Sequence, residues 1–291
     1  MNVRKSLAPA GLVLALVFAV FGGAGAAANP PSPQEAVTLV YKFTPGTPLS
    51  YKTTGAQVQN IDVMGQTMTT EIHSSLDLTL APKGLKDGNH LLGLTIDGMS
   101  VNVQGPQGGA TPDLKDVIGK SFDFVLSPGG EEVDVSGAAS LFIDMGQGGR
   151  REMTSDFQGI FPNVPATPVK VGDKWPVQET ITQKSDAGEI KIAFNNESTL
   201  DGFEKVDGLD CARIKTAVKG VMTGSLNQMG MALGMDAKLE GTDTSYFAVK
   251  EGMFVKSESA VDLAGTISAE GMGMTITFTG TQRGTSALVK K

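Results

Sequence analysis

Residues 214–239, "IKTAVKGVMTGSLNQMGMALGMDAKL", decide the fold that this sequence favours. Most apolar side chains recur there at even spacings, and lysines and small polar residues occupy the positions between them. Because successive side chains of a β-strand point to opposite faces of a sheet, this spacing predicts strands with one dry and one wet face. We expect two long antiparallel strands, 209–226 and 228–240.

The same alternation recurs along the rest of the chain. Asp-Gly and Gly-Gly steps separate the alternating runs and supply the positive φ that tight hairpins need. These turn signals lie at 86–89, 127–132, 200–202, 206–210 and 250–253. The other expected strands are 36–43, 49–60, 66–81, 90–103, 120–127, 131–136, 174–184, 188–200, 243–250, 253–268 and 271–283. Runs of this length indicate a strongly bent sheet, with bulges at glycines such as Gly98, Gly220 and Gly265.

One segment departs from the period of two. Residues 136–165 contain helix-like spacings with Gly and Pro at the ends, which predicts a short helical segment at 137–160. This segment separates two strand-rich regions, 36–135 and 169–283, whose weak similarity suggests a pseudo-repeat. The fold class we predict is mainly β, with a single domain over 36–285. It is a large, strongly curved antiparallel sheet, or half-barrel, whose concave face the helical segment covers.

The N-terminus has the order of a secretory signal peptide. Arg4 and Lys5 are followed by an apolar run that is too short for a typical transmembrane helix, and then by small residues. We expect a signal peptide at 1–28 and a disordered leader at 29–35. The single cysteine, Cys211, lies far from the cleavage region, so no lipid anchor is expected. The predicted location is therefore periplasmic or extracellular, without stable membrane insertion.

Charge and cysteine content limit the partners and the means of stabilisation. A formal charge of −7 without basic runs disfavours nucleic acids and anionic membrane surfaces as partners. One cysteine cannot form an internal disulfide, so the fold must be held together by its own core.

Three interpretations of the methionines in 214–239 stay open. With a period of two, Met229, Met231 and Met235 share the dry face of a strand. They are packed core, or the pliable lining of a lipid cleft, because methionine adapts to guests of varied shape. The third interpretation is a Cu(I) site, since thioethers suit that ion, although no Cys or His lies nearby in the sequence.

Two stretches carry a resemblance to known families. Residues 246–267, "YFAVKEGMFVKSESAVDLAGTI", together with the hairpin meander and the middle segment, resemble the half-barrel of periplasmic lipoprotein carriers and mycobacterial lipid-binding lipoproteins. Residues 165–175, "PATPVKVGDKW", resemble the Val-Gly-Asp-x-Trp motif of a family of uncharacterised exported bacterial proteins. The resemblance covers roughly residues 36–285 and implies a hydrophobic cavity that accepts acyl chains without chemistry. This chain is longer than the carriers and shows no arginine that matches their ligand-release switch.

The sequence contains no recognisable catalytic motif. Glu71, His73 and Ser75 share one face of a strand, but same-side Cα atoms there are roughly 6.6 Å apart and the side chains stand parallel. A nucleophile needs its base within hydrogen-bond reach, so a triad is not expected on this wet face. Cys211 has only Arg213 as a basic neighbour, which favours an inert thiol. We therefore predict no enzyme activity, no cofactor and no metal centre.

These observations predict an exported, non-enzymatic protein that binds a lipid or another hydrophobic small molecule in an apolar cleft. The residues expected to line the cleft are Phe142, Phe157, Met222, Leu226, Met229, Met231, Leu233, Met235, Met274, Ile276 and Phe278. One alternative is a cell-envelope interaction module with a closed core, which binds an envelope protein through polar loops such as 104–116. The other alternative is the methionine-based Cu(I) site.

Overall fold

A single curved sheet contains every named strand of the protein, in a computed structural model that describes residues 35–63, 65–106, 108–146, 149–228, 230–269 and 273–289. The order of neighbours is β6-β5-β3-β2-β1-β14-β13-β12-β11-β10-β9-β8-β7, and β4 pairs with β3. The predicted signal peptide at 1–28 lies outside the described residues, as does all of the predicted leader except its last residue. The strands are β1 (Leu49–Val63), β2 (Gln66–Lys86), β3 (Asn89–Gly105), β4 (Gly108–Ala110), β5 (Ser121–Leu126), β6 (Glu132–Asp134), β7 (Phe142–Asp144), β8 (Arg150–Glu152), β9 (Lys174–Ser185), β10 (Gly188–Val206), β11 (Leu209–Gln228), β12 (Met231–Ala248), β13 (Met253–Ala269) and β14 (Met274–Val289).

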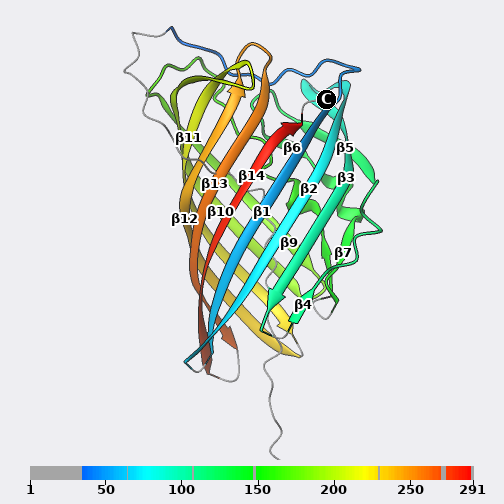
Figure 1. Ribbon diagram of the computed structural model, residues 1–291, viewed down its shortest axis with the longest axis vertical. Helices are drawn as coiled ribbons and strands as arrows, with labels where there is room; N and C mark the ends of the chain where they lie inside the picture. The colour runs from blue at the N-terminus through cyan, green and yellow to red at the C-terminus, as the bar shows by residue number, and fades with distance from the viewer. Residues whose placement is uncertain are drawn as a thin grey trace, which may run out of the picture.

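The long strands lie side by side, tilted, and wrap into a half-barrel (Figure 1). Every pairing between strands is antiparallel, and β14 returns beside β1, so the two predicted halves belong to one sheet. Two of the predicted Asp-Gly turns have the expected backbone. Asp87 and Gly88 have φ of 52° and 81°, and Asp207 and Gly208 have φ of 53° and 85°. Positive φ at both central residues matches the twist of the flanking strands.

Three strand expectations were wrong. Residues 36–43 pair only through an isolated bridge between Val37 and Val169. The expected strands 228–240 and 243–250 are parts of one continuous strand, β12. The Asp-Gly step at 200–202 is not a turn but a β-bulge within β10, where the register with β11 shifts.

The prediction of a helical segment at 137–160 was also wrong. Among its described residues the chain there forms short 3-10 turns, η1 (Ser136–Ser140) and η3 (Thr154–Phe157), on either side of the small hairpin of β7 and β8. Gly146 and Gly149 have φ of 64° and 73°, a conformation that reverses the chain and cannot continue a helix. The segment still packs on the sheet, because Ile143, Met153 and Phe157 are fully buried.

The core is divided into two main clusters along the strands. The upper cluster joins sheet residues such as Tyr51, Leu78 and Phe247 to buried residues of the connecting segments between 111 and 170, among them Phe157 and Phe161. The buried residues of the lower cluster all lie on the strands, toward the ends where β1 meets β2 and β13 meets β14, and Ala187 of the β9–β10 turn packs against them. Its buried members are Ile61, Ile190, Ile192, Met222, Leu226, Met235, Ala237, Leu239, Leu263, Ile267 and Phe278.

Glycines on the concave side allow the sheet to bend. A Cβ atom at Gly265 would overlap the carbonyl oxygen of Asp236, and one at Gly241 would overlap that of Ala260. Glycine at such positions permits a close approach of neighbouring backbones. The predicted bulge at Gly98 is present, because the register of β2 and β3 shifts beside it. Gly220 and Gly265 keep a continuous register instead.

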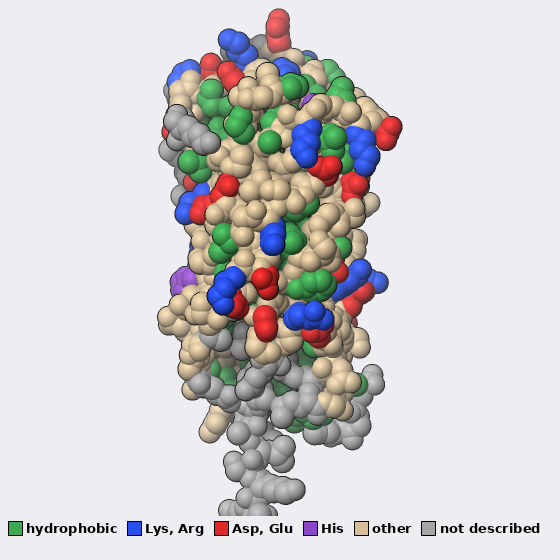
Figure 2. Space-filling view, turned by 90° about the vertical axis from the view of Figure 1, so that its right-hand side faces the viewer, with side chains coloured by type: hydrophobic (Ala, Val, Ile, Leu, Met, Phe, Trp, Pro, Cys, Tyr) green, Lys and Arg blue, Asp and Glu red, His purple; other side chains and the backbone are tan. Residues whose placement is uncertain are grey.

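The outer surface carries both signs of charge. Lys and Arg side chains are interspersed with Asp and Glu over the face drawn in Figure 2, without a large region of one sign. Several are ion pairs, such as Lys83 with Asp123 at 2.6 Å. No helix within the described ranges is long and apolar enough to cross a membrane.

Candidate functional site

The inner face of the sheet changes from apolar to polar between the two clusters. One level of the strand register runs from Gly55 on β1 through Gly284 on β14 and Ser259 on β13 to Asp243 on β12. The level above it contains Thr53, Ser286, Ser257 and Ser245. We call these inward residues, together with Gln57, Gln59 and Gln282, the polar belt.

The belt extends beyond these four strands with small polar residues. Thr216 on β11 is the register partner of Asp243, and Ser198 on β10 is the partner of Thr216. The Ser198 and Thr216 hydroxyl oxygens are 2.8 Å apart, and those of Thr53 and Ser286 are 3.0 Å apart. The hydroxyls of each pair are hydrogen-bonded to each other across neighbouring strands, so these polar groups of the belt have partners within the protein.

The centre of the belt is different, because its polar atoms lack partners. Both carboxamide atoms of Gln57 and of Gln59 have no hydrogen bond to any part of the chain that the structure describes. The same holds for one carboxyl oxygen of Asp243 and for the hydroxyls of Ser245, Ser257 and Ser259. All six side chains belong to buried residues, with exposed fractions of 6% or less. The large majority of buried side-chain polar atoms in proteins are hydrogen-bonded, so such a concentration requires an explanation.

Asp243 is the only acidic member of the belt. Its burial raises the pKa of the carboxyl well above the ordinary value of 3.8, although the Thr244 N–H and the nearby Ser245 hydroxyl favour the ionised form. The Ser245 hydroxyl makes no hydrogen bond with this carboxyl. Burial is therefore the larger influence on the pKa of Asp243. No Lys or Arg occupies a position in the belt as defined above. The site is therefore polar, buried and without a cation of its own.

Few atoms lie over Gly55, a glycine of the belt. A Cβ atom built on Gly55 would meet only the Ser74 hydroxyl, at 2.9 Å, and no other atom within 4 Å. The belt thus contrasts with the glycines of the lower cluster. There a Cβ atom at Gly224 would meet Ile190, Glu189 and Met235 within 3.5 Å.

The structure separates the eleven residues predicted to line a cleft. Met222, Leu226, Met235 and Phe278 are buried together in the lower cluster, and Leu233 and Ile276 pack against it. Phe157 belongs to the upper cluster. Met274 is half-buried on β14. Met229 lies outside the described residues.

Two of the predicted residues are exposed. Phe142 on β7 is 38% exposed, and its ring lies 5.2 Å from the guanidinium carbon of Arg150. Met231, also 38% exposed, lies at the end of β12. Among the described residues no group of three or more His, Cys, Asp or Glu side chains could hold a metal ion. A copper site at Met229 and Met231 would depend on a residue outside that range.

The residues weighed for catalysis lie apart from the belt. Glu71 and His73 are exposed on the outer face of β2, and the Ser75 hydroxyl is 2.8 Å from that of Ser100. Cys211 is fully buried in a small cluster with Val206, Tyr246, Ala248 and Val255. The polar loop 104–116 is anchored by a buried Leu114.

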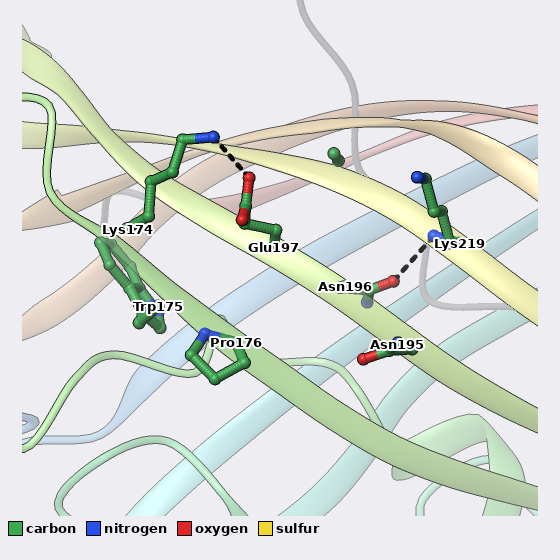
Figure 3. Close-up of a pocket in the computed structure, with 8 residues that line it drawn as sticks. Lys174, Trp175, Pro176, Asn195, Asn196, Glu197 and Lys219 are labelled. Carbon is green, nitrogen blue, oxygen red and sulfur yellow. Dashed lines mark hydrogen bonds and ion pairs between the residues drawn. The ribbon is translucent and has the colours of Figure 1, made fainter.

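A surface hollow of about 360 Å³ lies at the level of the belt, where the pairing of β10 with β11 lapses at Asn195 and Asn196. The Asn196 side chain compensates by accepting a hydrogen bond from the Lys219 backbone N–H at 3.0 Å (Figure 3). Lys174 and Glu197 form an ion pair of 2.5 Å at its rim. None of the ten predicted residues that the structure describes lines this hollow.

Trp175, in the motif that carried the resemblance, borders the same hollow but is 8% exposed. Its indole N–H donates to the Asn163 carbonyl at 3.1 Å, and its ring belongs to the upper cluster. The tryptophan thus fastens β9 to the connecting segment.

Sequence patterns did not identify the belt. Gln57, Gln59 and Asp243 sit at inward positions of their strands, yet each is a polar residue in a mixed stretch. They come together only through the register of four strands, which the sequence of one strand does not contain. The signal that could have found them is the run of polar residues at alternate positions 53, 57 and 59, continuing the face of Tyr51 and Ile61.

Comparisons with known proteins identify no family. No protein-family model matches the chain, and no curated protein matches it. Among solved structures, a DUF1329 family protein from Desulfovibrio piger is similar at 12% identity and a TM-score of 0.14, over 79% of this chain and 83% of that chain. At this TM-score the likeness supports neither a shared fold nor a shared function.

Proposed function

We propose that the chain is an exported, non-enzymatic protein that binds a lipid or another hydrophobic small molecule inside its curved sheet. The observation that carries this proposal is the composition of the lower cluster. Its members come from the strands and from the β9–β10 turn, whereas the connecting segments between 111 and 170 contribute only to the upper cluster.

Methionine supports the proposal at the lower cluster. Met222 and Met235 lie on neighbouring strands and are buried there. Unbranched, polarisable methionine side chains accommodate guests of varied shape. Binding sites for small molecules are mostly apolar with a few polar groups that fix orientation, and the lower cluster beside the belt has this composition. Export is supported by the signal-like sequence at 1–28.

Native mass spectrometry of the protein after mild extraction tests the proposal. A bound hydrophobic molecule of defined mass is the expected result. A protein that carries no such molecule and whose Tm does not rise with any medium-chain lipid contradicts the proposal. Retention of an envelope protein instead of a lipid would favour the interaction-module alternative.

A space-filling substitution separates a binding cleft from a closed core. We expect Ala237→Leu, in the lower cluster, to weaken lipid binding, because the larger side chain takes up room on the inner face that the proposed ligand would contact. Ala138→Leu, in the fully buried upper cluster, is the matched control and should cost about 1–3 kcal/mol, the usual penalty for overpacking. If Ala237→Leu costs as much as the control and leaves binding unchanged, the lower cluster is closed core.

A further inference from the structure

We propose that the polar belt recognises an uncharged, hydroxyl-bearing head group of the bound molecule, whose apolar part lies against the lower cluster. This inference rests on the proposed function, and it specifies the chemical class of ligand. The belt lies directly between the lower cluster and the upper cluster, so a ligand would place its polar end in the middle of the sheet. Its apolar part would run toward the end where β13 meets β14.

The unpartnered atoms determine which head group fits. Gln57 and Gln59 each offer a carboxamide with both donors and an acceptor, and Ser257 and Ser259 offer hydroxyls that can do either. An unmade hydrogen bond at a buried group costs about 1–3 kcal/mol, so these groups favour a ligand that satisfies donors and acceptors together. A hydroxyl both donates and accepts.

Charged head groups fit the belt less well. An anionic phosphate or carboxylate would meet the Asp243 carboxyl and would find no Lys or Arg in the belt. An alkylammonium could pair with Asp243, but it has no lone pair with which to accept hydrogen bonds from the Gln57 and Gln59 carboxamides. Several hydroxyls on one head group would satisfy the carboxamides, the serines and a protonated or ionised Asp243.

Gly55 leaves room for such a group, because only the movable Ser74 hydroxyl lies near the position of its missing Cβ. Gly55 and Gly284 are adjacent in the register, and Ser74 on β2 and Ser259 on β13 flank them at the same level. Gln57 follows Gly55 two residues along β1. Neighbouring strands are about 4.8 Å apart and same-face residues of one strand about 6.6 Å apart, so Gln57 and Ser259 lie on diagonally opposite sides of the Gly55 and Gly284 pair. The position above Gly55, bordered only by the movable Ser74 hydroxyl at 2.9 Å, lies within this arrangement.

Three probes with the same ten-carbon chain test the inference on the full-length protein. They are 1-decanoylglycerol, decanoate and decylamine, each titrated by calorimetry at neutral pH. We expect decanoylglycerol to bind at least about tenfold more tightly than either charged probe, the factor that one well-made hydrogen bond supplies.

Gln57→Leu is the informative variant, because it removes buried unpartnered atoms and should therefore fold with an unchanged or higher Tm. It should lose at least about threefold of the preference for decanoylglycerol. Gln178→Leu makes the same chemical change on the exposed outer face of β9 and should leave the preference intact.

The outcomes distinguish the inference from the proposed function. If all three probes bind equally, or if Gln57→Leu keeps the full preference for decanoylglycerol, the belt does not recognise the head group. The proposal that the protein binds a lipid is unaffected by that result. If decylamine or decanoate binds most tightly, the inference is overturned in favour of a charged ligand. If none of the probes binds and none raises the Tm, the proposed function fails as well.

Discussion

Cys211 shows how burial controls a reactive side chain in this protein. Its thiol is fully buried, and burial, followed by the negative charges of Glu251, Asp210 and Glu204, raises its pKa to about 11. The thiolate is the reactive species, so at pH 8 the native thiol should react with an aromatic disulfide reagent about 100-fold or more slowly than the thiol of the unfolded chain. The measurement is the rate of colour release with and without guanidinium. Equal rates would contradict the burial.

Two carboxyls inside the fold predict a pH dependence of stability. Burial, and then the charge of Glu179, raises the pKa of Glu132 to about 8, and burial, and then Glu131, raises that of Glu179 to about 7. The Glu132 carboxyl also accepts hydrogen bonds from the Gly159 and Phe161 N–H groups at 3.2 Å. Both carboxyls therefore bind protons more tightly in the folded chain than at their ordinary value of 4.5.

Because the folded state holds more protons between pH 4.5 and about 8, the stability from these carboxyls is complete below that range and is lost as the pH rises through it. We expect the Tm to be higher at pH 5.5 than at pH 8.5. Glu179→Gln should shrink the difference, whereas Glu71→Gln on the exposed outer face should not. A Tm that rises with pH over this range would reverse the sign and contradict the account.

The connecting segment between β6 and β9 depends on one buried ion pair. The Arg151 guanidinium donates to both oxygens of the Asp156 carboxylate, at 2.6 and 3.0 Å, and both side chains are buried. Removing one partner leaves an unpaired buried charge, so Arg151→Leu should reduce the free energy of unfolding by about 3–5 kcal/mol. The measurement is denaturant unfolding.

Lys83→Leu is the control for this prediction. Lys83 forms an exposed pair with Asp123, and exposed pairs contribute about 0–1 kcal/mol. Equal effects of the two substitutions would show that the Arg151 pair does not hold the segment.

The curvature of the sheet depends on inward glycines. Gly265→Ala should destabilise the protein by about 1–3 kcal/mol or more, because its Cβ would overlap the backbone of β12 and force the strands apart. Gly55→Ala is the control, since its Cβ meets only the movable Ser74 hydroxyl. The midpoint of urea unfolding measures both. A smaller loss for Gly265→Ala than for Gly55→Ala would show that the curvature has another cause.

Strand predictions succeeded where alternation and turn chemistry agreed, as in β2 and β3 on either side of Asp87 and Gly88. They failed for 36–43, whose alternating Leu39 and Tyr41 are buried although the segment forms no ladder. Alternation of apolar and polar residues shows only that one side of the segment is buried. A β-strand also needs a neighbouring strand to which its backbone can hydrogen-bond. The Tyr41 N–H bonds to the Pro128 carbonyl instead. The helix prediction failed because short apolar spacings occur equally well in 3-10 turns interrupted by glycine.

At the scale of the whole molecule, the half-barrel could be predicted from the sequence but its layering could not. Each of β1, β12, β13 and β14 changes from apolar to polar and back along its inner face, and only the register aligns these changes into one belt. The lower cluster was partly foreseen, since Met222, Leu226, Met235 and Phe278 are among its members. Phe142 and Phe157 were assigned to the same surface because the segment that contains them was expected to cover it as a helix.

An amphipathic interior places a constraint on the whole fold. Buried polar atoms without partners cost stability, and stability is commonly sacrificed at sites that serve a function. The belt therefore links the stability of the molecule to its proposed ligand, because a ligand that binds only the folded state raises its Tm.

A titration of methyl-labelled methionine with 1-decanoylglycerol, followed by NMR, tests ligand binding in the half-barrel most directly. Met222 and Met235 lie in the lower cluster, and Met153, equally buried, lies in the upper cluster. We expect saturable shifts of the Met222 and Met235 methyl resonances and none at Met153. Shifts at Met153, or unchanged resonances at both Met222 and Met235, would contradict a ligand held inside the lower half of the curved sheet.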